Sequence, residues 1–262
     1  MATRVVIEKK LALKDPVMLT GLPGIGLVGK ICVDYFIKEL KPQKIGRILS
    51  DSFPPSVHTA NAVIELISDE LFALELKDRH LLFLAGPVQP NLDFRVGANA
   101  EHYEFASAVA TAAKSLGVKT VVTLAGINVG DKRLEKEPQI IVAATDSKLL
   151  SEFVKLGAVA DKKEGLISGA AGLILGIGAE QGLEGVCLMG ETSTRLVYGD
   201  PGAAKRVMEL LVKKFGLSVN LDQITAEAKN IQDAFKQLNA QMQNPENADE
   251  DALPENGLTY VH

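Results

Sequence analysis

The residues with the clearest potential for chemistry are the glycines of LTGLPGIGLVGKICVDYF, at positions 19–36. Gly24, Gly26 and Gly29 form the pattern G-x-G-x-x-G of dinucleotide-binding loops. Gly24 and Gly29 together with Lys30 also form G-x-x-x-x-G-K, the beginning of a Walker A loop. Both kinds of loop bind phosphate groups with backbone amides at the beginning of a helix. The first question is therefore whether this chain holds a nucleotide.

The residues around the glycines argue against both kinds of nucleotide site. A Walker A loop needs a Ser or Thr hydroxyl for Mg²⁺ after its lysine, whereas Ile31 and Cys32 follow Lys30 here. Asp51 lies about 20 residues beyond the glycines, as in dinucleotide-binding units, but Pro23 lengthens the turn. We therefore interpret the glycines as sites where a helix packs closely on a strand, and we predict no bound cofactor.

No other set of residues has the spacing of a metal site or a catalytic site. The two cysteines, Cys32 and Cys187, lie far apart in apolar stretches and are predicted to be reduced and buried. The sequence has no G-x-S-x-G motif and no nucleophile with a nearby base. The histidines are not spaced as metal ligands; they are His58, His80, His102 and His262. The sequence therefore predicts a protein that is not an enzyme and binds no metal.

Charged residues that could line a site fall in two groups. Asp93, Arg95 and Glu104 lie near the ends of predicted elements, where they either line a crevice or form surface ion pairs of little energetic value. The segment 128–138, NVGDKRLEKEP, is predicted to be a solvated loop unless an anionic partner meets its basic residues. Neither group predicts a specific reaction.

The composition restricts the class of protein and its partners. The chain has 262 residues, 47% of them hydrophobic, which is enough for a full-sized core. A net charge of −5 and the absence of tryptophan make nucleic acid an improbable partner. We find neither a signal peptide nor an apolar run long enough to span a membrane. We therefore expect a cytoplasmic protein that binds neither membranes nor nucleic acid.

The elements that would position a site alternate between strands and helices, which predicts an α/β fold built on a largely parallel sheet. Residues 62–68 and 71–76, joined by a short polar turn around Asp69, are predicted to form a hairpin. The other predicted strands are 17–20, 44–49, 80–86, 120–126, 139–145 and 185–190, and the main predicted helices are 28–40, 99–116, 147–156, part of 166–180 and 201–215.

Four predicted strands end in the same way, in Leu-x-Gly, at Gly21, Gly86, Gly126 and Gly190. If these strands are parallel, their carboxyl ends share the edge of the sheet where ligand crevices occur. The glycines then either serve only as sharp strand exits or line a crevice together with Asn128 and Glu191. The second alternative predicts a nucleoside-binding or metabolite-binding protein, or an enzyme that acts on such a compound.

The C-terminal part of the chain differs from the α/β core, which is assigned to residues 1–220. Residues 221–243 are predicted to form one amphipathic helix that either docks on its own domain or pairs with another subunit. Its apolar residues recur every three or four positions, at Ile224, Ala228, Ile231, Phe235, Leu238 and Met242. Residues 244–262 are rich in acidic residues and predict a flexible tail, although it ends in an apolar and aromatic cluster.

Three segments resemble the proteasome assembly chaperone family, in its archaeal branch. They are GLPGIGLVGKICVDYFIKEL at 21–40, GPVQP at 86–90 and DPGAAKRVMELLVKKFGL at 200–217. The resemblance spans roughly residues 1–240. It implies a three-layer core similar to the purine nucleoside phosphorylase-like fold, but without catalytic residues. It also implies a dimer, a tetramer or a hetero-oligomer with a paralogue, in which members bind the α-subunit ring of the proteasome core particle.

Several members of the family bind that ring through a C-terminal motif of a hydrophobic residue, a tyrosine and one further residue. The residues that would correspond here are Leu258, Tyr260, Val261 and His262. The tyrosine is third from the end and follows a threonine, whereas the family motif places it next to last. The resemblance thus implies a non-enzymatic assembly chaperone or ATP-independent adaptor. Nucleoside or metabolite binding at the sheet edge is the alternative.

Overall fold

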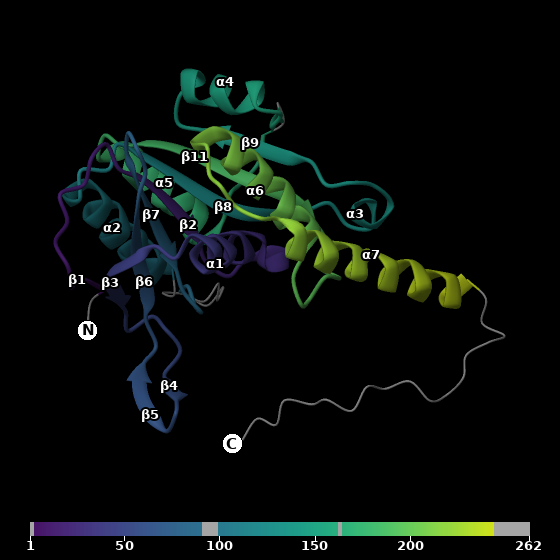
Figure 1. Ribbon diagram of the computed structural model, residues 1–262, viewed down its shortest axis with the longest axis horizontal. Coiled ribbons are helices and arrows are strands. Elements are labelled where there is room, and N and C mark those ends of the chain that lie inside the picture. Colours follow the sequence, from purple (N-terminus) through teal and green to yellow (C-terminus); the bar gives the residue numbers. More distant parts are fainter. Residues whose placement is uncertain (1–2, 91–98, 162–163, 244–262) are drawn as a thin grey trace.

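The computed structural model describes residues 3–90, 99–161 and 164–243, and Figure 1 shows their arrangement. Among these residues, nine strands form one sheet. Their spatial order is β1 (Arg4–Ile7), β3 (Gln43–Leu49), β6 (Asp69–Glu75), β7 (His80–Ala85), β2 (Val17–Gly21), β8 (Thr120–Asn128), β11 (Glu184–Thr192), β9 (Ile140–Ala144) and β10 (Val159–Ala160).

The sheet is mixed, which corrects the expectation of a largely parallel one. Its centre is parallel, because β7, β2, β8 and β11 all run in the same direction. The pairs β1–β3, β3–β6, β6–β7 and β9–β11 are antiparallel. A parallel connection needs a long crossover, and no helix lies between residues 43 and 85. The strands of that part therefore pair antiparallel.

The predicted hairpin of 62–68 with 71–76 is wrong. Residues of the first segment form β5 (Val63–Leu66), which pairs with β4 (Val57–Ala60) in a separate two-stranded sheet that projects from the body (Figure 1). Asn61 and Ala62 join these strands, and both have positive φ angles, 49° and 63°. Two such residues are typical of a tight hairpin turn. The second segment instead forms β6 inside the main sheet.

Helices cover both faces of the main sheet, which gives three layers (Figure 1). The first face carries α1 (Val28–Leu40), α4 (Ser147–Lys155), α6 (Pro201–Phe215) and the beginning of α7 (Asp222–Gln243). The second face carries α2 (Asn99–Ser115) and α5 (Gly169–Glu180). A short 3-10 helix η1 (Ile25–Leu27) precedes α1, and a short α3 (Lys132–Glu135) follows β8. Of the helices in the described ranges, none is long and apolar enough to cross a membrane.

The hydrophobic core has two halves, one on each face of the sheet. Phe36 of α1 packs on Phe83 of β7 with ring centroids 6.2 Å apart in the first half. Cys32 belongs to this half, and Cys187 belongs to the second half. Both thiols are free and buried, as predicted. Burial raises the pKa of Cys187 to about 11 and also raises the pKa of Cys32, so both thiols are protonated near neutral pH.

Candidate functional site

The glycine-rich loop after β2 brings α1 into direct contact with β8. A Cβ atom on Gly29 would lie 2.1 Å from the carbonyl oxygen of Leu124, and a Cβ on Gly126 would lie 2.1 Å from that of Ile25. Gly26 has a φ of +61°, which glycine adopts without strain. The glycines therefore allow close packing of the helix on the sheet, as the sequence indicated.

The contacts of this loop do not resemble a nucleotide site. The Lys30 ammonium donates a hydrogen bond to Asp34 at 2.7 Å and a longer one to the Gly86 carbonyl oxygen at 3.4 Å. Asp51 follows β3, which is separated from β2 by β6 and β7. In a dinucleotide-binding unit, the acidic residue follows the strand next to the glycine loop. The arrangement of the strands thus excludes Asp51 as the acidic partner of the glycine loop.

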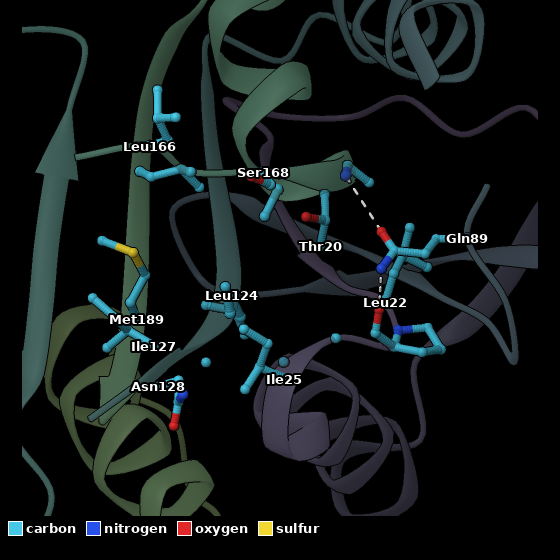
Figure 2. Close-up of a pocket in the computed structure, with 18 residues that line it drawn as sticks. Thr20, Leu22, Ile25, Gln89, Leu124, Ile127, Asn128, Leu166, Ser168 and Met189 are labelled. Carbon is cyan, nitrogen blue, oxygen red and sulfur yellow. Dashed lines mark hydrogen bonds between the residues drawn. The ribbon is translucent and has the colours of Figure 1, made fainter. Parts of the chain in front are cut away.

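The four Leu-x-Gly strand ends lie at one edge of the sheet, as predicted from the sequence. Next to this edge lies a cavity of about 210 Å³ between the glycine loop and the beginning of α5 (Figure 2). Of the predicted crevice residues, Gly126 and Asn128 line the cavity. Gln89, Ser168 and Met189 also line it. They were not predicted as site residues, because their segments are far apart in the sequence.

The remaining predicted crevice residues have structural contacts elsewhere. A Cβ on Gly86 would overlap the Asp69 carboxyl group, and a Cβ on Gly190 would come within 3.1 Å of Ala203 in α6. The Glu191 carboxylate accepts a hydrogen bond from the Gln139 amide at 3.0 Å and pairs with Lys136 at 3.6 Å. Glu191 therefore holds the strand β9 and its preceding loop in place.

Asp69 was predicted to lie in a polar turn, but its side chain is completely buried at the beginning of β6. Burial raises the pKa of this carboxyl group well above its usual value, although the Val88 backbone and the Lys30 charge oppose the shift. The raised pKa favours the protonated form, which is the form that an apolar interior tolerates. Asp69 is not among the described residues that line the cavity at the sheet edge.

Arg133 in α3 forms a buried ion pair that the sequence did not predict. Its Nε and Nη2 atoms donate to the two carboxylate oxygens of Asp200, each at 2.7 Å. The two side chains are 12% and 1% exposed. Asp200 also caps α6 by accepting a hydrogen bond from the Ala203 amide at 2.9 Å. The segment expected to be a solvated loop therefore fixes the beginning of α6.

The beginning of α7 packs on the domain from which it emerges. Ile224 is completely buried in the first half of the core. Ala228 and Ile231 are half-buried and line a small cavity together with Arg133 and Leu196. Figure 1 shows that α7 then extends away from the body. The helical backbone includes Phe235, Leu238 and Met242, whose side chains lie outside the described part.

The predicted tail anchor lies outside the described residues, since Leu258, Tyr260, Val261 and His262 all fall in 244–262. Asp93 and Arg95 also lie outside them, whereas Glu104 accepts a hydrogen bond from the Thr3 amide at 2.5 Å. Within the described ranges, no three His, Cys, Asp or Glu side chains are grouped so that they could hold a metal ion.

Comparison with known proteins agrees with this architecture. The sequence is 29% identical to that of PbaB from Pyrococcus furiosus, an archaeal proteasome activator. The fold matches the crystal structure of PbaB with a TM-score of 0.80. That match covers 91% of this chain and 99% of PbaB. PbaA from the same organism, a homolog of proteasome-assembly chaperone, has the same fold, with a TM-score of 0.71 at 24% identity over 94% of each chain.

A curated sequence relative and a family model extend the match. The uncharacterized protein MJ1210 of Methanocaldococcus jannaschii is 28% identical over 227 residues, which cover 86% of this chain and 84% of that protein. The model of the PAC2 family matches residues 18–239, from the beginning of β2 to the distal part of α7. This confirms the family resemblance seen in the glycine-rich, GPVQP and α6 segments: the chain belongs to the PAC2 family.

Proposed function

We propose that this protein is a non-enzymatic proteasome-binding factor, either an assembly chaperone or an ATP-independent adaptor of the core particle. The observation that carries the proposal is the match to PbaB, an archaeal proteasome activator, over 99% of that chain at 29% identity. The described contacts of Lys30 and Glu191 are consistent with it, because both side chains are bonded to neighbouring groups of the protein itself.

In the proposed mechanism, the C-terminal segment 244–262 connects the body to the α-subunit ring. Leu258, Tyr260, Val261 and His262 enter pockets between neighbouring α subunits, with the tyrosine ring as the main apolar contact. A chain of this length spans roughly 20–25 Å root-mean-square if it is flexible, which is enough to reach beyond the end of α7. Several such segments on one oligomer increase the overall affinity without any new contact.

We infer that the distal part of α7 forms the homo-oligomer, or a hetero-oligomer with a paralogue. The proximal residues Ile224, Ala228 and Ile231 already pack on the domain itself. The seam continues in the sequence through Phe235, Leu238 and Met242. An apolar seam on a helix that extends beyond its own domain fits a coiled-coil-like contact with a second subunit.

The proposal is tested by binding of the purified protein to an archaeal proteasome core particle. We expect the full-length protein to bind, and a variant that ends at Leu258 to lose binding. Tyr260→Ala should weaken binding strongly, whereas Thr259→Ala is the matched control and should bind as the wild type does. Binding that survives truncation would contradict the role of the tail, and no binding by the full-length protein would contradict the proposed function.

The role of α7 is tested separately by light scattering. Phe235→Asp should lower the molecular mass, because it places a charge in the proposed subunit contact. Ala234→Asp introduces the same charge at an exposed position of α7 and serves as the control. An unchanged mass for Phe235→Asp would show that the subunits meet elsewhere.

A further inference from the structure

The cavity at the carboxyl edge of the sheet has the construction of a ligand pocket. Its floor is the second face of the sheet, where Thr20 of β2, Ile127 of β8 and Met189 of β11 line the cavity (Figure 2). Its walls are the glycine loop on one side and the residues that begin α5 on the other. Crevices of open α/β sheets occur at this edge, where neighbouring strands lead to opposite faces.

Thr20 places a hydroxyl group in the pocket. The residue as a whole is only 3% exposed. None of the described hydrogen bonds involves its hydroxyl, and Figure 2 shows Thr20 among the residues that surround the cavity. The hydroxyl is not one of the completely enclosed polar atoms that lack a partner, so it keeps access to the space of the cavity. It can therefore donate a hydrogen bond to a ligand there.

The beginning of α5 supplies further donors to the same pocket. The first amides of a helix have no partner inside the helix, and Ser168 provides no side-chain cap for them. One of them, the Ala170 amide, donates to the Gln89 side chain at 3.3 Å. The helix has 12 residues, so its N-terminal end carries a partial positive charge that favours an anionic group.

Gln89 connects the two walls of the pocket. Its amide oxygen accepts the hydrogen bond from Ala170, and its amide nitrogen donates to the Pro23 carbonyl oxygen in the glycine loop (Figure 2). Gln89 belongs to the GPVQP segment, and Pro23 belongs to the GLPGIG segment. These two segments, which both carry the family resemblance, therefore meet at the pocket.

The size and the lining of the pocket restrict its ligand. Its volume of about 210 Å³ exceeds that of the roughly 150 Å³ cavity that accommodates benzene. The apolar lining includes Leu22, Ile25, Ile127 and Met189. A monocyclic ring with one small polar group fits this space.

We propose that this pocket binds a small monocarboxylate with an apolar body the size of one ring. The Thr20 hydroxyl and the beginning of α5 receive the carboxylate, and the apolar side chains of the floor and the glycine loop enclose the body. The described lining of the site contains no residue of α7, the helix that leads to the proposed proteasome contact.

Methyl NMR of the full-length protein, labelled at methionine and isoleucine methyl groups, tests this proposal with benzoate as the probe. Saturable shifts of the Met189 and Ile127 methyl signals are expected, with benzamide binding at least several-fold more weakly because it lacks the charge. Thr20→Val should weaken benzoate binding about tenfold, as expected for the loss of one hydrogen bond to a carboxylate. Ala171→Leu fills the pocket and should abolish the shifts.

Gly176→Ala, on the same helix but with no atom within 4 Å of the new Cβ, is the matched control and should bind benzoate as the wild type does. Melting temperatures establish that each variant is folded. Shifts that persist in Ala171→Leu, or that never saturate, would overturn the site. Equal affinity for benzamide, or tighter binding of adenosine, would overturn the assignment to a monocarboxylate.

Discussion

Replacing Asp200 tests how much one buried carboxylate contributes to the free energy of unfolding through its contacts with α3 and α6. This side chain makes a two-point ion pair with Arg133, with both distances at 2.7 Å, and it caps α6 through the Ala203 amide. Its backbone amide also donates to the Gly26 carbonyl oxygen at 2.8 Å, which links α6 to the glycine loop. The loss of the side chain therefore affects α3 and α6 together.

The expected magnitude follows from burial. Removing one partner of a buried ion pair costs about 3–5 kcal/mol, because the other charge stays buried without compensation. Loss of a helix cap adds about 1 kcal/mol. We therefore expect Asp200→Ala to lower the free energy of unfolding by about 4–6 kcal/mol, from a total of about 5–15 kcal/mol for a domain. Asp200→Asn preserves the cap and should cost about 1 kcal/mol less.

Urea denaturation followed by circular dichroism, at one fixed protein concentration, measures these values. Arg133→Met alone should also cost about 3–5 kcal/mol, whereas the double variant Arg133→Met, Asp200→Asn should cost far less than the sum of the two single changes. Strict additivity would refute the reasoning, because it would mean that the two side chains do not depend on one another. A cost for Asp200→Asn equal to that for Asp200→Ala would refute the contribution of the cap.

Three further changes test other contacts. Ile224→Ala should lower the free energy of unfolding by about 2–5 kcal/mol, because it leaves a cavity where α7 meets the core, and an unchanged urea midpoint would contradict that docking. Gly29→Ala should lower the melting temperature much more than Gly24→Ala, since only the first new methyl group would collide with a backbone oxygen, at 2.1 Å. Asp69→Asn should become increasingly favourable relative to the wild type as the pH rises above about 4, the usual aspartate pKa. The reason is that burial raises the pKa of Asp69 in the folded state. Above about pH 4 the carboxyl group ionises in the unfolded chain before it does so in the folded protein, which lowers the stability of the wild type alone. Parallel stability–pH profiles of the two proteins would contradict this.

Sequence patterns that depend on neighbouring residues predicted much of this fold. The Leu-x-Gly strand ends lie at one edge because their strands form the parallel centre of the sheet. Asp200 and Pro201 begin α6 as their residue types indicate. Cys32 and Cys187 are buried because the residues around them are apolar on the inward faces of their elements.

The errors arose where the structure depends on residues far apart in the sequence. Residues 71–76 are close in sequence to 62–68, but they pair with β3 and β7 because the apolar face of β6 is buried in the main sheet. The hairpin turn lies instead at Asn61 and Ala62, which have positive φ angles and precede the predicted turn around Asp69. Asn61 is the residue in the sequence that could have indicated this turn, because asparagine is common in turns. Arg133 was assigned to a solvated loop because its partner, Asp200, is distant in sequence.

The candidate pocket was predictable only in its location. The sheet edge follows from the strand ends, and two of the predicted residues, Gly126 and Asn128, line the cavity. Gln89 and Ser168 were missed because their segments, after β7 and before α5, are far apart in the sequence and only the fold brings them together. Glu191 was predicted to line the crevice, but the strand pairing of β9 next to β11 gives its carboxylate a local partner.

The positions of the two cysteines have a consequence for how this molecule opens. Cys32 lies on α1, where its thiol donates a hydrogen bond to the Ala204 carbonyl oxygen of α6, whereas Cys187 lies on β11 in the core half formed with α2 and α5 on the opposite face. A reagent can reach one thiol only when the helices on that face separate from the sheet, and the other thiol reports the other face in the same way. The chain therefore carries two internal reporters of opening, one in each half of its core, and their relative rates of labelling distinguish which layer detaches first.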